Sequence, residues 1–119
     1  MEKIADRNSW KTQPLPAQRV KLNIERTFTD QEYSLISKGL IPEQMEDKWF
    51  IFMENDILFL HRSWTGFCIY EVHFDSQHAI RAVWANRNRD QHTQTNDEHD
   101  GANLIYLIEY FLLGKRKFN

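Results

Sequence analysis

The stretch from residue 49 to residue 86 constrains the fold of this chain most, because it has the pattern of four short strands in succession. The strand-like runs span residues 49–54, 57–64, 67–74 and 78–86. Asn55-Asp56 and Thr65-Gly66 separate the first three runs and are short enough for tight hairpin turns, and Asp75-Ser76-Gln77 supplies a third turn. The pattern predicts a four-stranded antiparallel meander.

The segments on either side of this meander complete the predicted fold. Apolar and polar residues alternate over residues 20–25, which indicates an edge strand. Thr29 and Glu32 have the spacing of a capping box and begin a short helix that Gly39 ends. The predicted fold class is therefore α+β, with a four- to five-stranded meander and a short N-terminal helix.

A second helix is predicted near the C-terminus and should pack across the sheet. The apolar residues at helical spacing are Leu104, Leu107, Ile108, Phe111 and Leu112. Gly114 is the expected C-cap, and the basic residues 115–117 complement the helix dipole.

A chain of 119 residues fits one domain of common size. Pro14 and Pro16 keep the neighbouring backbone extended, so we expect residues 1–17 to form an arm and residues 18–119 to form a single domain. Internal repeats are absent from the sequence.

Charge and cysteine content exclude several classes of function. The formal net charge is −2 and the basic residues are scattered, so we expect neither duplex nucleic acid nor a membrane as a partner. Cys68 is the sole cysteine, which rules out an internal disulfide and a cysteine-based zinc site. The first residues are charged where a signal peptide is apolar, so a cytoplasmic location is expected.

The turn between the second and third predicted strands gathers side chains that suit a nucleotide. His61, Arg62, Ser63, Trp64 and Thr65 lie next to one another before a glycine. A guanidinium matches phosphate, and an indole offers a face on which a base can stack. The alternative is structural, with the indole covering the edge of the core, the arginine stem lying over it, and an ordinary turn behind them.

A second group of candidate residues lies at the end of the fourth predicted strand and in the loop that follows. It comprises Arg81, Trp84, Asn86 and Arg87, with Arg89 beyond them. In a regular meander this strand end and the 65–66 turn fall at the same end of the sheet, so the two groups could form one pocket. Alternatively, the loop arginines are solvated charges.

Metal-dependent and nucleophilic chemistry have weaker support. His92, Asp97, His99 and Asp100 form the densest group of potential ligands, but their spacing matches no metal motif. Cys68 lies in an apolar strand, where a thiol is inert. A pair of His61 with Ser63 on one strand face is conceivable, although the serine lacks a nucleophile-elbow motif. We therefore expect no metal and no cofactor.

Residues 45–52 and 59–70 resemble a small bacterial domain that occurs together with ADP-ribosyl-(dinitrogen reductase) hydrolase. The most distinctive string is His-Arg-Ser-Trp-Thr-Gly at residues 61–66, and the likeness runs from about residue 28 to residue 114. ADP-ribosylglycohydrolases themselves are much larger all-helical proteins with paired acidic metal ligands, so the resemblance does not extend to a catalytic fold. It implies an association with ADP-ribose or another NAD-derived molecule.

These observations lead to a first hypothesis and two alternatives. The first is a non-catalytic binding module for a diphosphate-containing nucleotide, ADP-ribose-like or NAD-derived. Arg62 and Arg87 would hold phosphate, Trp64 and Trp84 would stack on the base, and Asn86 would orient a polar edge. Such a module could sequester a signalling nucleotide, as phage anti-defence sponges do, and a homo-oligomer could complete the pocket.

The first alternative is a protein–protein adaptor or immunity protein that uses the same aromatic and arginine side chains as interface anchors. The second alternative is a small hydrolase of ADP-ribosyl compounds that acts through His61 and a nearby acid.

Overall fold

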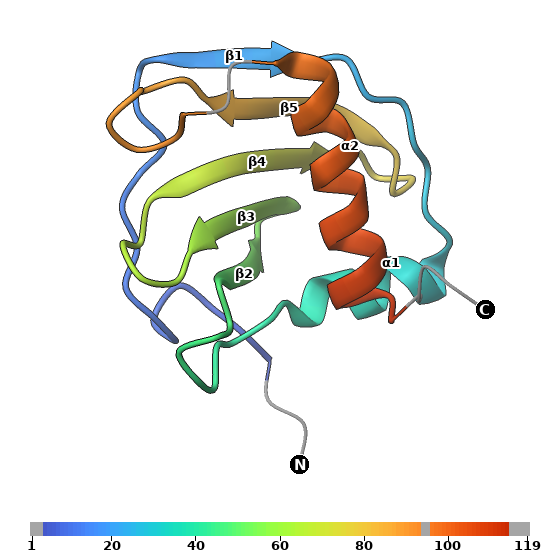
Figure 1. Ribbon diagram of the computed structural model, residues 1–119. Helices are drawn as coiled ribbons and strands as arrows, with labels where there is room; N and C mark the ends of the chain where they lie inside the picture. Colours follow the sequence, from blue (N-terminus) through green and yellow to red (C-terminus); the bar gives the residue numbers. More distant parts are fainter. Residues whose placement is uncertain (1–3, 94–95, 115–119) are drawn as a thin grey trace, which may run out of the picture.

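The computed structural model describes residues 4–93 and 96–114 and has an α+β fold. One antiparallel sheet is covered on one face by the C-terminal helix (Figure 1). The elements in chain order are β1 (Arg19–Leu22), α1 (Asp30–Lys38), β2 (Trp49–Glu54), β3 (Ile57–Arg62), β4 (Cys68–Phe74), β5 (Ile80–Asn86), α2 (Asp97–Leu107) and the π-helical turn η1 (Ile108–Leu112).

The predicted meander is confirmed, and the N-terminal strand extends it to five strands. The sheet order is β1-β5-β4-β3-β2, and every neighbouring pair is antiparallel. β1 pairs with β5 in a register that places Arg19 opposite Asn86 and Leu22 opposite Val83. β1 and β2 are therefore the edge strands of the sheet. β5, the last strand in the sequence, is internal and lies between β1 and β4.

The edge strand predicted over residues 20–25 begins at Arg19 and ends three residues early, at Leu22. The strands of the meander are shorter than predicted at three ends. β3 stops at Arg62, because Gly66 N–H donates to the Arg62 carbonyl at 2.8 Å and the chain turns there. β4 begins one residue late, at Cys68. β5 begins at Ile80, since His78 has a φ of 65° and belongs to the preceding turn.

The capping box of α1 is present as the sequence predicts. The Thr29 hydroxyl accepts from Glu32 N–H, and the Glu32 carboxylate accepts from Thr29 N–H, both at 3.0 Å. Gly39 then ends the helix with a φ of 69°. The adjacent Leu40 pairs with Ile51 through two backbone hydrogen bonds, so the exit from α1 is fixed against the edge of the sheet.

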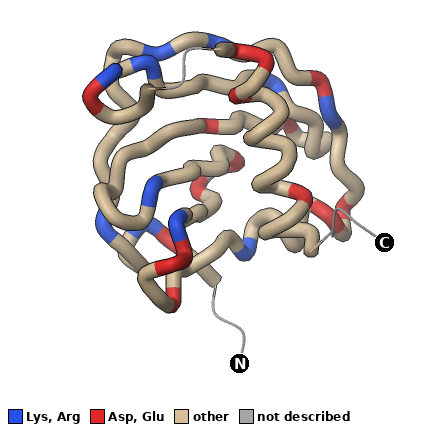
Figure 2. Tube along the Cα trace, viewed as in Figure 1, with Lys and Arg blue, Asp and Glu red and all other residues tan. Residues whose placement is uncertain are grey.

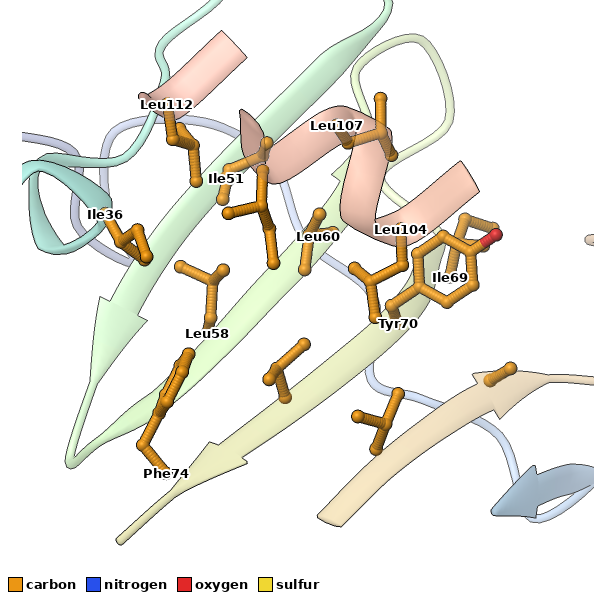
Figure 3. Packing of buried hydrophobic residues seen from close by; sticks show 14 of the residues in the cluster. Ile36, Ile51, Leu58, Leu60, Ile69, Tyr70, Phe74, Leu104, Leu107 and Leu112 are labelled. Carbon is orange, nitrogen blue, oxygen red and sulfur yellow. The ribbon is translucent and has the colours of Figure 1, made fainter. Parts of the chain in front are cut away.

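Helix α2 lies across the sheet and closes the main core (Figures 1 and 3). Leu104, Leu107 and Ile108 pack on Leu60 and Tyr70 of the central strands. The core around them also contains buried residues from α1, β1, β2 and β5: Leu22, Ile36, Ile51, Val83 and Ala85.

The helical spacing wrongly placed Phe111 in this core. The helix continues as the π-turn η1, in which Leu113 N–H donates to the Ile108 carbonyl five residues back. The wider turn rotates the following side chains around the axis. Leu112 is buried as expected, but Phe111 is 41% exposed. Gly114 has the positive φ of 71° expected after a helix, and residues 115–117 lie outside the described residues.

The opposite face of the sheet is covered in part by the N-terminal segment. Ala5, Phe50 and Phe52 form a small second core there, and the Arg7 guanidinium lies over the Phe52 and Phe59 rings. Cys68 is buried, and burial raises the pKa of its thiol, so this cysteine is not a ready nucleophile.

In the described parts of the chain, neither helix has the length and apolar character needed to cross a lipid bilayer. Along the Cα trace of the described residues, Lys and Arg positions are interspersed with Asp and Glu positions (Figure 2).

Candidate functional site

Three connecting segments converge at one end of the sheet, on the left in Figure 1: residues 42–48, the turn 63–67 and the loop 87–93. The convergence follows from the meander, since the turn after β3 and the chain leaving β5 are both at this end. The segments therefore bring together residues that lie far apart in the sequence.

The turn and the loop after β5 form a pocket of about 330 Å³, which we call the basic pocket. Its size is at the lower end of the range for small-molecule sites. It is lined by Lys48, Arg62, Trp64, Thr65, Phe67, Ile69, Asp90, Gln91 and His92. Two permanent cations and one carboxylate thus surround a partly apolar floor, which favours an anionic ligand.

Aromatic rings hold the two cations of the basic pocket. The Lys48 ammonium lies 4.1 Å from the centroid of the Trp64 ring, and the Arg62 guanidinium lies 5.0 Å from that of Trp49. Trp49 is in turn stacked near Tyr70, at 6.2 Å between ring centroids. Cation–π contacts of this kind restrict the side chains without neutralising their charge. No ion pair of Lys48 or Arg62 occurs among the residues described, so both charges remain available to a ligand.

Trp64 also lines a second hollow of about 450 Å³, which we call the aromatic pocket. The other residues that line it are Trp10, Lys11, Pro42, Glu43, Gln44, Met45 and Ser63. Its wall carries large exposed apolar side chains: Trp64 is 57% exposed, Met45 73% and Trp10 38%. One indole therefore separates a basic pocket from a mainly apolar one.

A set of hydrogen bonds fixes the walls of the aromatic pocket. Trp64 Nε1 donates to the Met45 carbonyl at 2.9 Å, and Trp10 Nε1 donates to the Ser63 carbonyl at 2.7 Å. The Ser63 hydroxyl donates to the Asp47 carbonyl at 2.6 Å. The N-terminal segment, the 42–48 segment and the turn are thereby tied to one another, so the hollow is preformed.

A buried polar cluster lies behind the basic pocket and is centred on Asp100, which is 1% exposed. Its Oδ1 accepts from the Tyr70 hydroxyl at 2.6 Å and lies 3.1 Å from His92 Nε2. Its Oδ2 forms an ion pair with Arg87 Nη1 at 2.7 Å. Burial, together with the bond to Asp100, raises the pKa of Tyr70, whose hydroxyl also accepts from Asn103. This cluster joins α2 to β4 and to the loop after β5.

Of the residues predicted for the site, Arg62, Trp64 and Thr65 line the basic pocket, and Ser63 lines the aromatic pocket. His61 is instead buried beneath the N-terminal segment at 2% exposure. Its Nδ1 donates to the Gly66 carbonyl at 2.8 Å, and burial lowers its pKa. Because its hydroxyl is bonded to Asp47, Ser63 makes no pair with His61.

The second predicted group does not join the basic pocket. Asn86 is buried and bonds the Cys68 carbonyl and the Gln91 side chain, and Arg87 pairs with Asp97 and Asp100. Both residues therefore hold the loop after β5 in place and do not line the basic pocket themselves. Arg81 lies at the far end of β5, and Trp84 points to the opposite face from the buried Val83 and Ala85.

The sequence patterns did not assign Lys48, Gln91 or His92 to this pocket. They grouped His92 with Asp100 as potential metal ligands, whereas in the structure Asp100 is a hydrogen-bond partner of His92. The available signal was the polar loop after β5, at the same end of the sheet as the 65–66 turn. Of the suggested metal group, His92 and Asp100 lie together, but the described part of the chain contains no cluster of three or more histidine, cysteine, aspartate or glutamate ligands.

No protein-family model matches the chain, and the searches of curated proteins and of solved structures also found no match.

Proposed function

We propose that this protein is a binding module for a nucleotide that carries a diphosphate, of the ADP-ribose or NAD-derived class. The observation that supports it is the shared wall formed by Trp64. Phosphate would lie in the basic pocket, and the base would stack in the aromatic pocket next door.

The phosphate half of this proposal rests on charge and geometry. Arg62 presents a planar fork for phosphate oxygens, Lys48 adds a point charge, and the Thr65 hydroxyl is a further donor. The basic pocket is too small to enclose a whole dinucleotide, so the remainder of the ligand would extend past Trp64. The class of nucleotide comes from the sequence resemblance, and sequestration of a signalling nucleotide would be its simplest use.

We expect ADP-ribose to raise the melting temperature by several degrees, since a ligand at about one hundred times its Kd stabilises a protein by roughly 2.7 kcal/mol. Arg62→Ala should weaken binding by about tenfold or more, because it removes a charge-assisted contact. Arg81→Ala is the matched control, as Arg81 lies at the other end of β5. Differential scanning fluorimetry with ADP-ribose, NAD and cyclic nucleotides measures both effects. Absence of any shift, or equal losses in the two variants, would rule the proposal out.

The exposed aromatic pocket also favours a second candidate, a protein-binding adaptor. Trp10, Met45 and Trp64 place large apolar side chains side by side at the surface, as interface anchors are placed. If no nucleotide binds and a defined protein partner loses affinity in Met45→Ser and Trp64→Ala variants, this second candidate replaces the first. The burial of His61 speaks against the hydrolase alternative, which was to act through His61 and a nearby acid.

A further inference from the structure

His92 lies in the loop after β5, and no sequence motif predicted it as a residue of the basic pocket. Nε2 of its ring has a hydrogen-bond partner in the protein, and Nδ1 can contact a ligand. Nε2 lies 3.1 Å from the buried Asp100 Oδ1. A carboxylate so placed fixes the ring orientation and the position of its proton, which lies on Nε2 in the neutral form. The backbone N–H of His92 donates to the Asn88 carbonyl at 2.8 Å, so the loop itself is also held.

The second ring nitrogen of His92 has access to solvent. Nδ1 has no hydrogen-bond partner among the described residues, yet it is not one of their fully buried unsatisfied atoms. The side chain is 18% exposed and lines the basic pocket beside Arg62 and Lys48. In the neutral ring Nδ1 is an acceptor and would repel a phosphate oxygen. In the protonated ring Nδ1 is a donor, which suits a phosphate oxygen.

We propose that His92 is a direct contact to the bound anion and that binding of the anion is coupled to uptake of one proton at Nδ1. The inference rests on the proposed function, since it concerns the same pocket. It makes Asp100 a positioning residue, which acts on the ligand through His92. It also gives the pocket a preference for anions that increases as the pH falls.

The charges around His92 support this coupling. Lys48 and Arg62 oppose a further cation when the pocket is empty, and a bound diphosphate reverses that field. Asp90 on the pocket wall and Asp100 behind the ring both favour the imidazolium, although Arg87 already neutralises part of the Asp100 charge. The Tyr70 hydroxyl, which also faces Asp100, has a raised pKa and stays protonated. Binding of an anionic ligand therefore favours protonation of the His92 ring.

The test is the Kd of ADP-ribose from pH 5.5 to 8, measured by titration calorimetry. Its phosphates form a diester and lack the ionisation near pH 6 of a phosphomonoester, so the ligand contributes no proton of its own. Coupling to one proton predicts a Kd that rises by up to about tenfold per pH unit on the alkaline side of the titration. In His92→Gln the amide can still donate to Asp100, and we expect weaker binding with a flat pH profile. The matched control is His99→Gln, at an exposed position in the first turn of α2, which should keep the wild-type profile.

The possible failures are distinguishable. Binding that is independent of pH, or equally pH-dependent in His92→Gln, overturns the inference and leaves the proposed function standing. Absence of ADP-ribose binding at every pH overturns both. Melting temperatures of the variants without ADP-ribose show whether a loss of binding is a loss of folding.

Discussion

Asp100→Ala should lower the free energy of unfolding by about 3 kcal/mol or more, among the largest effects expected of one substitution in this protein. The substitution leaves Arg87, whose side chain is 16% exposed, without its buried partner, and removes the acceptor of the Tyr70 hydroxyl. A buried ion pair adds little net stability when intact, but loss of one partner strands the other charge. Urea unfolding followed by circular dichroism measures the difference.

Asp97→Ala is the matched control for this prediction. Asp97 also pairs with Arg87, at 2.6 Å, but its side chain is 59% exposed, and exposed pairs contribute about 1 kcal/mol or less. Equal losses in the two variants would mean that the Asp100 cluster is solvated and does not anchor α2 on the sheet.

Gly39→Ala should destabilise the fold by about 3 kcal/mol, from a strained backbone and from overpacking together. The residue has a φ of 69°, and a Cβ there would overlap the Ile51 carbonyl oxygen and lie 2.9 Å from the Ala5 side chain. Relief requires moving the chain that exits α1 away from the edge of β2. The melting temperature and urea midpoint of the variant give the size of the effect.

Gly114→Ala separates the effect of backbone strain from the effect of overpacking. Gly114 has nearly the same φ, 71°, but no atom of the described residues lies within 4 Å of the position of its Cβ. This variant should lose roughly 1 kcal/mol, the cost of the left-handed conformation alone. If Gly39→Ala lowered the free energy of unfolding no more than Gly114→Ala does, the claim that Gly39 is closely packed against β2 would be wrong.

Local patterns were sufficient to predict most of the fold. Alternating residues and turn residues located β2 to β5 within three residues at each end, and the Thr29–Glu32 spacing gave the start of α1. Each of these signals acts over a few residues, where side-chain period and backbone preference decide the conformation. The π-turn is the exception, because a helical period cannot indicate an inserted wider turn, and Phe111 was placed wrongly as a result.

The pocket depends on contacts that no local pattern encodes. Arg62, Trp64 and Thr65 were found because they surround a recognisable turn. Lys48 and His92 were not assigned to this pocket, because the loops that bring them to that turn have no regular period. The pairing of Asp100 with Tyr70 spans 30 residues and depends on how α2 crosses the sheet. Conversely, Asn86 and Arg87 have the residue types of a ligand site, but their hydrogen bonds serve the protein itself.

The central claim, that a nucleotide binds on both sides of Trp64, is tested most directly by the indole N–H signals of the four tryptophans in a ¹H–¹⁵N NMR titration with ADP-ribose. We predict that the Trp64 and Trp10 signals shift and saturate together, since both rings line the aromatic pocket. The Trp84 signal should stay in place, because Trp84 lines neither the aromatic pocket nor the basic pocket. A Trp84 shift without one at Trp64, or no shift of any indole at saturating ADP-ribose, would contradict the account.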